Sequence, residues 1–196
     1  MYHIALFHDR TFYANLTRLD QDLAAETRAR GCPCGGRLHR ADYPRKPRGG
    51  PAELGPAYEW RLSFCCDRDG CRRRATPPSL RFLGRRVYLS VVVVLISLLA
   101  HGLTHARLVR LRDRLSGPLS LRTILRWRTW WRDSFPRTAF WRTARSRFAT
   151  PVELSRLPAT LLERFRGATL AEQVQALLVF LAPLTILPRA PSAGDS

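Results

Sequence analysis

Two stretches decide the fold: Cys32-Pro33-Cys34-Gly35-Gly36 and Cys65-Cys66-Asp67-Arg68-Asp69-Gly70-Cys71. Together they hold all five cysteines of the chain. Thiolates presented by two tight turns suit one tetrahedral metal ion, because each turn can supply two sulfurs. A disulfide with a leftover thiol, or a chance grouping of free thiols, is the alternative. The grouping of all five cysteines, without a secretory signal at the start, favours a zinc site over disulfides.

The spacing leaves the ligand set partly open. A zinc ribbon usually separates each cysteine pair by two residues, whereas one residue separates the first pair here. In the second stretch, side chains that alternate along residues 60–66 place Cys66 on one face of a strand and Cys65 on the other. The expected ligands are Cys32, Cys34, Cys66 and Cys71, with Cys65 or His39 as possible substitutes.

The two stretches resemble the N-terminal zinc ribbon of bacterial transposase-type proteins. That pattern is a Cys-Pro-x-Cys-Gly knuckle, a hairpin, an aromatic residue before a cysteine, then a further cysteine and an arginine-rich run. Residues 71–74 (Cys-Arg-Arg-Arg) and 76–79 (Thr-Pro-Pro-Ser) are similar to its end, while the first knuckle is one residue short. The resemblance implies a β zinc ribbon that belongs to a DNA-binding region.

The positive charge is concentrated in the middle of the chain. The 196 residues carry a formal net charge of +18, and residues 80–148 hold fifteen arginines against two aspartates. A basic field of this density indicates a polyanionic partner, here double-stranded DNA.

The N-terminal segment is expected to lead into the ribbon. Residues 2–7 predict a short strand. Residues 11–30 predict a helix, because Phe12, Leu16, Leu19 and Leu23 recur at helical spacing. Gly31 ends this helix. Residues 44–56, rich in Pro and Gly, predict a loop between two ribbon strands, and residues 58–64 predict the return strand.

Residues 87–104 carry no formal charge and allow three interpretations. Their length lies at the lower edge of a membrane span, but serine, histidine and glycine interrupt them and arginine flanks both ends. Four successive valines permit a buried strand. The favoured interpretation is the central helix of a compact helical domain, because a partner for it follows directly.

That partner is predicted to be a helix-turn-helix. Residues 104–115 form the first helix, residues 116–119 (Ser-Gly-Pro-Leu) the turn, and residues 121–134 the second helix with Ser120 as N-cap. We expect the apolar side of the second helix to gather the following side chains: Leu121, Ile124, Leu125, Trp131 and Phe135. Trp127 and Trp131 are expected in the core. Trp130 should face away, toward DNA or a neighbouring helix.

Recognition helices place their first residues against base edges in the major groove, where arginine binds guanine. Residues 120–127 resemble the recognition helix of transposase and resolvase helix-turn-helix domains. The expected DNA-binding residues are Ser120, Arg122, Thr123, Arg126, Arg110 and Arg114. Among them Arg122, Thr123 and Arg126 should lie against base edges, and Arg110 and Arg114 should contact the backbone. The alternative is an arginine-rich solvated face on an ordinary bundle.

The last quarter of the chain is neutral. Residues 169–172 (Thr-Leu-Ala-Glu) form a capping box for a helix over residues 169–187, which either packs on the core or docks a protein.

The chain is therefore expected to be α+β and mostly α. The predicted parts are residues 1–79 (strand, helix and zinc ribbon), 80–148 (helix-turn-helix), 149–187 (C-terminal packing helices) and 188–196 (a disordered tail).

The predicted function is that of a non-catalytic, zinc-containing, DNA-binding accessory or targeting protein of a mobile genetic element. It is expected in the cytoplasm, together with a transposase or integrase encoded nearby. The alternatives are a membrane-anchored zinc-ribbon regulator that uses residues 87–104 as its span, and a catalytic transposase or nuclease. The latter is disfavoured because only six acidic residues follow residue 79.

Overall fold

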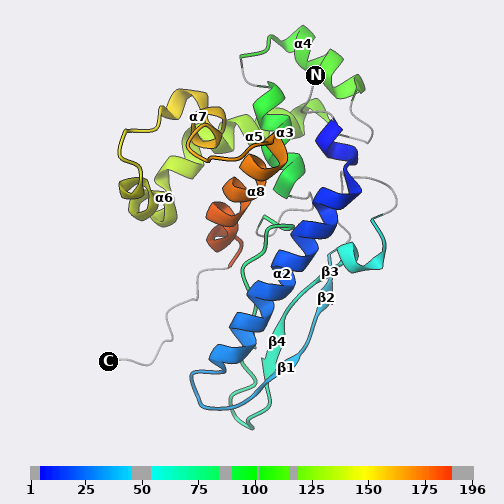
Figure 1. Cartoon of the computed structure of the whole chain (residues 1–196), viewed down its shortest axis with the longest axis vertical. Coiled ribbons are helices and arrows are strands. Elements are labelled where there is room, and N and C mark those ends of the chain that lie inside the picture. The colour runs from blue at the N-terminus through cyan, green and yellow to red at the C-terminus, as the bar shows by residue number, and fades with distance from the viewer. Residues whose placement is uncertain (1–4, 46–53, 84–89, 101, 115–118, 187–196) are drawn as a thin grey trace.

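The computed structural model describes residues 5–45, 54–83, 90–100, 102–114 and 119–186, with the backbone alone for Val91 and residues 111–114. Most described elements are helices, and the strands are short, which confirms the predicted α+β, mostly α class. Figure 1 shows the shorter helices gathered at one end of the molecule and the strands at the other. A single long helix, α2 (Arg10–Arg30), runs along both parts.

Helix α2 forms where the apolar spacing predicts it. Asp9 caps its first turn by accepting a hydrogen bond from the Phe12 amide at 3.0 Å. Gly31 ends it with a φ of +69°, a conformation that favours glycine. The predicted strand over residues 2–7 is wrong in its described part. Residues Leu6–His8 form a 3₁₀ turn, because the Asp9 amide bonds back to the Leu6 carbonyl and leads directly into α2.

The ribbon contains a three-stranded antiparallel sheet in the order β1 (Leu38–Arg40), β4 (Phe64–Cys66) and β5 (Arg74–Ala75). Leu38 lies opposite Cys66, and Cys65 lies between His39 and Arg74 on its two neighbours. A second pair, β2 (Tyr43–Pro44) and β3 (Trp60–Arg61), extends the hairpin toward the helices.

The return strand predicted over residues 58–64 is divided. It begins as a 3₁₀ turn at Pro56–Glu59, continues as β3 and resumes as β4. Tyr58 causes the turn to pack on α2, since its ring lies 5.6 Å from that of Tyr13 and its hydroxyl donates to the Tyr13 carbonyl. Residues 46–53 of the predicted loop lie outside the described part of the chain.

The remaining helices are α3 (Ser90–Ala100), α4 (His105–Arg114), α5 (Leu121–Thr129), α6 (Ala139–Ala144), α7 (Ala159–Leu162) and α8 (Leu170–Leu181). Helix α3 lies at their centre, in contact with α4, α5 and α8, and residues 92–97 are buried. The favoured interpretation of this apolar segment as a core helix is confirmed for residues 90–100. In the described ranges, no helix combines the length and apolar character that crossing a membrane requires.

Helix α5 continues into a π-helical turn at Trp130–Ser134, followed by a 3₁₀ turn at Phe135–Arg137. Trp127, Trp131 and Phe135 are all buried along this stretch, which confirms the core role predicted for the two tryptophans. Trp130 does not face away as expected. It is half-buried, with its ring 4.7 Å from that of Trp131 and 5.6 Å from that of Phe135.

The described buried side chains form two apolar clusters. The larger joins the first half of α2 to α3, α5 and α8, and includes Val174, Leu177, Leu178 and Leu181 of the predicted packing helix. Thr169 caps α8 through the Glu172 amide at 3.2 Å, as the sequence predicts. The smaller cluster belongs to the ribbon and consists of Ala24, Cys32, Leu38, Phe64 and Cys66. The predicted tail, residues 188–196, lies outside the described residues.

A buried ion pair links the two ends of the molecule. Asp20 of α2 and Arg81, which follows the ribbon, are each 1% exposed, and the Arg81 Nε donates to Asp20 Oδ2 at 2.8 Å. Asp20 also accepts from the Leu80 amide, while the Arg81 guanidinium donates to the carbonyls of Ala57 and Trp60. Because every charged group is hydrogen-bonded, the pair is tolerated inside the core.

Candidate metal centre

The first knuckle is a tight turn closed by its own backbone. The Gly35 amide donates to the Cys32 carbonyl at 2.8 Å, and the Cys32 amide donates to the Gly36 carbonyl at 3.2 Å. Gly35 has a φ of +83°, which a side chain would strain. A Cβ on Gly36 would lie 2.5 Å from Cys66 Sγ, so only glycine lets the two stretches approach this closely. The turn thus points Cys32 and Cys34 at the second stretch.

The second stretch adds two sulfurs from the end of β4 and the turn after it. The Cys66 amide donates to the Arg73 carbonyl at 2.9 Å, and the Cys71 amide donates to the Arg68 carbonyl at 3.1 Å. Gly70, with a φ of +80°, reverses the chain between them. Asp67 ties the two stretches together, since its Oδ1 accepts from the Arg37 amide at 2.9 Å.

The four sulfurs form one compact group. Cys34 Sγ lies 3.4 Å from the sulfurs of both Cys32 and Cys66, and Cys32 Sγ lies 3.7 Å from that of Cys71. All four lie within 4.8 Å of one another. Four thiolates around a tetrahedral zinc ion at ~2.3 Å have sulfurs ~3.8 Å apart. The geometry therefore fits a single metal ion held by the four cysteines that the sequence predicts.

The pKa values of the clustered cysteines differ because of their surroundings. The Gly36 amide donates to Cys34 Sγ at 3.4 Å and is the main cause that lowers the pKa of Cys34 to about 6. The Arg68 amide likewise lowers the pKa of Cys66, but burial and the neighbouring thiols outweigh it and raise that pKa to about 12. Four thiols this close cannot all ionise by themselves, whereas a bound cation would allow four thiolates to coexist.

The two substitutes considered from the sequence lie outside this group. Strand register places His39 opposite Cys65, on the face of the sheet away from Cys66. Cys65 Sγ lies 3.5 Å from the Arg72 carbonyl, and His39 Nε2 lies 3.2 Å from Asp67 Oδ2. Both side chains are thus occupied on the opposite side of the strand.

The predicted DNA-contacting residues are partly brought together on α5. Arg122 and Arg126 are exposed, and Arg110 is exposed on α4, which contacts α5. The Arg114 side chain and residues 115–118 of the predicted turn lie outside the described part. The Ser120 hydroxyl caps α5 by accepting from the Thr123 amide at 3.2 Å.

Two residues of α5 lie on the opposite side of the helix from the one predicted: Thr123 was expected to be exposed and Leu125 to be buried. Thr123 is only 8% exposed, whereas Leu125 is 41% exposed. Thr123 can lie inside because its hydroxyl is hydrogen-bonded to that of Ser120 at 2.9 Å. The exposed face of α5 therefore consists of Arg122, Leu125, Arg126 and Thr129, which share one side at i, i+3, i+4 and i+7. The capping pair Ser120–Thr123 is the sequence signal that could have indicated this.

No protein-family model matches the chain, and neither a curated protein nor a solved structure shows significant similarity to it.

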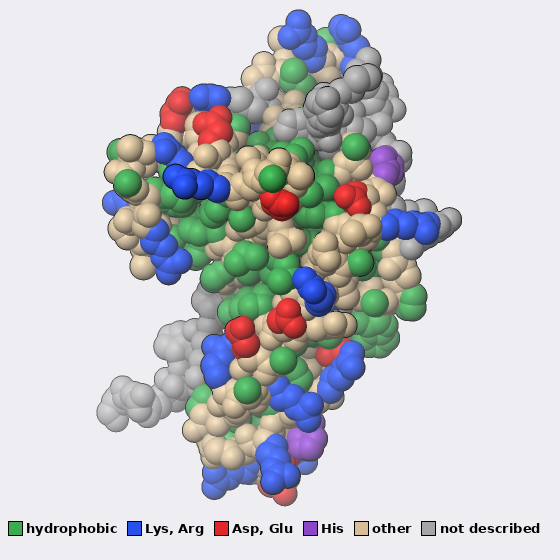
Figure 2. Space-filling model, in the orientation of Figure 1, with side chains coloured by type: hydrophobic (Ala, Val, Ile, Leu, Met, Phe, Trp, Pro, Cys, Tyr) green, Lys and Arg blue, Asp and Glu red, His purple; other side chains and the backbone are tan. Residues whose placement is uncertain are grey.

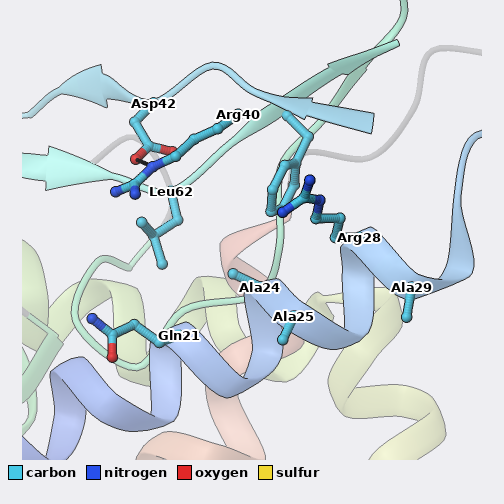
Figure 3. Close-up of a pocket in the computed structure, with 9 residues that line it drawn as sticks. Gln21, Ala24, Ala25, Arg28, Ala29, Arg40, Asp42 and Leu62 are labelled. Carbon is cyan, nitrogen blue, oxygen red and sulfur yellow. Dashed lines mark hydrogen bonds and ion pairs between the residues drawn. The ribbon is translucent and has the colours of Figure 1, made fainter. Parts of the chain in front are cut away.

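One further hollow lies beside the ribbon, between α2 and the strands (Figure 3). This groove of about 610 Å³ is lined by Gln21, Ala24, Ala25, Arg28, Ala29, Arg40, Asp42, Leu62 and Phe64. Its floor is apolar, and at its rim Arg40 pairs with Asp42 at 2.5 Å. With no cysteine, histidine or pair of carboxylates in its lining, the groove is a gap between helix and sheet and contributes nothing to the metal group.

Proposed function

We propose that the chain is a zinc-containing DNA-binding protein without catalytic activity, which serves as an accessory or targeting factor of a mobile genetic element. The arginine-bearing exposed face of α5, beside α4, is the observation that carries the DNA-binding part of this proposal. The four-cysteine group carries the zinc part.

Zinc is favoured among metals by the donor set. Four thiolates in tetrahedral arrangement are typical of structural zinc, which leaves no open position for catalysis. In this role Cys32, Cys34, Cys66 and Cys71 hold the ion, and the ion holds the two knuckles of the ribbon together.

Double-stranded DNA is favoured as partner by the chemistry of α5. Arg122 and Arg126 lie one turn apart near the start of the helix, where a recognition helix approaches base edges. An arginine there can bind guanine through two hydrogen bonds, and Leu125 between them offers an apolar contact for a thymine methyl group. Figure 2 shows further basic side chains over α4 and around α6, where they can meet phosphates.

The role in a mobile element rests on the resemblance of the knuckles and of residues 120–127 to transposase-type proteins. In that role the chain positions a transposase or integrase at a DNA site, and the partner supplies the catalytic carboxylates.

Paired substitutions on α5 and α4 test the DNA-binding proposal at equal change of charge. The variants are Arg122→Ala/Arg126→Ala and Arg107→Ala/Arg110→Ala, and all four side chains are exposed. Binding is measured by fluorescence anisotropy at two salt concentrations, on a duplex selected from a random pool and on an unselected duplex. We expect each α5 substitution to weaken the binding free energy for the selected duplex by about 1–3 kcal/mol. The α5 variant should then show little preference for the selected duplex over the unselected one.

The α4 variant should weaken both duplexes alike, because phosphate contacts carry no sequence information. Equal losses of affinity on both duplexes for both variants would show that the α5 face is only a charged surface and reads no sequence. If the unaltered protein binds neither duplex, the proposed DNA binding is wrong.

A further inference from the structure

The metal-holding end of the molecule carries its own concentration of positive charge. Residues 28–40 and 65–75 contain eight arginines against two aspartates, and every one of these arginines is exposed. We call this surface the basic ribbon end. Its arginines are Arg28, Arg30, Arg37, Arg40, Arg68, Arg72, Arg73 and Arg74. It lies apart from the arginines of α4–α6, at the opposite end of α2 (Figures 1 and 2).

The strands hold part of this charge in a fixed arrangement. The Asp67 amide donates to the Arg37 carbonyl at 3.0 Å, and the Cys66 amide donates to the Arg73 carbonyl at 2.9 Å. Arg37 and Arg73 therefore flank the end of β4 from its two sides. The four-cysteine group lies next to these two arginines, since Cys66 is the last residue of β4.

The two acidic residues of this surface are already occupied. Asp67 accepts from the Arg37 amide and contacts His39, while Asp69 pairs with Arg72 at 3.1 Å. Among the described residues, the side chains of Arg28, Arg37 and Arg73 form no hydrogen bond or ion pair with the protein. Their guanidinium groups are therefore available to an external anion, and guanidinium suits phosphate in particular.

Helix α2, which runs from the large core to the ribbon, is about as long as one turn of DNA. The first half of α2 packs in the large core with α3 and α5, while Ala24 and the end of α2 pack on the ribbon. The twenty-one residues of α2 span about 30 Å at ~1.5 Å per residue. One turn of B-DNA measures ~34–36 Å. A duplex that contacts α5 and runs parallel to α2 would present phosphates about one turn away to the basic ribbon end.

We propose that the basic ribbon end is a second phosphate-backbone contact, so that the protein binds one duplex at two places about one helical turn apart. This inference rests on the proposed DNA binding by α5 and adds to it a second surface and a minimum duplex length. The metal then has a role in binding as well as in folding, since it fixes the strands that carry Arg37 and Arg73.

Duplex length is the variable that tests this. Affinity of the zinc-loaded full chain is measured on duplexes of about 10 and about 25 base pairs, which reach one surface or both. The variants are Arg37→Ala/Arg73→Ala and, as a matched control, Arg18→Ala/Arg166→Ala, whose side chains are exposed and form no ion pair within the described residues. Zinc content and circular dichroism verify that each variant is folded.

A longer duplex offers more positions at which the protein can bind, which raises the apparent affinity in proportion to their number. Beyond this statistical gain, we expect the unaltered protein to bind the longer duplex at least tenfold more tightly, because the second contact is intramolecular. Arg37→Ala/Arg73→Ala should lose this gain, with the slope of log K against log salt on the long duplex reduced by about two. The short-duplex affinity should be unchanged, and the control variant should behave like the unaltered protein.

Equal affinities after correction for the number of binding positions, or equal losses for the ribbon and control variants, would overturn the second contact. In those cases binding of the short duplex, sensitive to Arg122 and Arg126, would still support the proposed function. Failure of the unaltered protein to bind either duplex would overturn both.

Discussion

The ribbon and the helical region differ in what holds their buried side chains together. In the described ribbon the buried cluster has five members, and two of them, Cys32 and Cys66, are ligands of the metal group. In the helical region α3, α5 and α8 meet through aliphatic and aromatic side chains, with Val93, Val94, Leu95 and Ile96 fully buried. A core as small as that of the ribbon is not expected to offset the entropy of ordering its chain, so with the proposed zinc site the ribbon would depend on the bound ion.

One chain thus holds two regions whose stability has separate sources. Removal of the metal should affect one region, and a cavity in the aromatic core should affect the other. Helix α2 belongs to both clusters, and the Asp20–Arg81 pair links them.

The largest effect is expected from Cys66→Ser. Loss of a thiolate should abolish metal binding, whose apparent free energy in structural zinc sites is of order 10 kcal/mol. Metal analysis should find no zinc, and amide exchange over residues 32–40 and 64–75 should become fast while α3 and α8 stay protected. Cys65→Ser is the matched control, because this thiol lies outside the metal group. Retention of zinc by the Cys66 variant would contradict the assignment.

The link between the regions is tested by Asp20→Asn. This change leaves the Arg81 guanidinium buried without its counter-charge, which typically costs about 3–5 kcal/mol. Urea unfolding should show the loss in both regions, as followed by tryptophan fluorescence and by zinc release. Asp22→Asn, at an exposed position two residues further along α2, should change the unfolding free energy by less than about 0.5 kcal/mol. An equally small effect at Asp20 would show that the pair contributes nothing to joining the regions.

The helical region alone is tested by neighbouring substitutions on α5. Ile124 is fully buried and Leu125 is 41% exposed. Ile124→Ala should lower the unfolding free energy by about 2–5 kcal/mol through the cavity it leaves, while Leu125→Ala should cost under about 0.5 kcal/mol. Zinc content should be unchanged in both. The reverse ranking, measured by thermal unfolding, would mean that α5 faces the core with its other side.

The smallest effect is expected from Ser120→Ala. Its hydroxyl caps α5, and the loss of such a cap costs about 1 kcal/mol. It also leaves the Thr123 hydroxyl, which is 2.9 Å away, without this hydrogen bond. Thermal unfolding should show a decrease for Ser120→Ala that is absent for Ser134→Ala, an exposed serine further along the same helical stretch. Matching melting temperatures would show that the start of α5 does not depend on its cap.

Local patterns in the sequence were sufficient for several elements. Helix α2, its end at Gly31 and the caps of α5 and α8 follow from residues a few positions apart, so periodicity and capping chemistry predict them. The grouping of Cys32, Cys34, Cys66 and Cys71 was also predicted, because alternation along β4 separates Cys66 from Cys65. In each case the deciding contacts are local or follow from the period of a strand.

Contacts between distant residues were beyond the reach of these patterns. Asp20 and Arg81 lie sixty-one positions apart, and nothing near either of them indicates the other. Tyr58 begins a turn instead of a strand because it packs on Tyr13. Leu125 and Thr123 were misplaced because the predicted apolar face was extrapolated from Trp131 and Phe135, which lie in or beyond the π-helical turn and do not keep the α-helical period.

The π-helical turn at Trp130–Ser134 has a consequence for how the arginines beyond it are aimed. A π-helical turn takes up one residue more than an α-helical turn for nearly the same rotation around the axis. Deletion of one residue within Trp130–Ser134 can therefore be absorbed by closing the turn to an α-helical one, whereas the same deletion earlier in α5 would rotate the downstream chain by about 100°. The exposed side chains of Arg142, Arg145 and Arg147 would keep their direction in the first case and change it in the second. The wide turn thus lets this stretch change its length by one residue without redirecting the basic side chains that follow it.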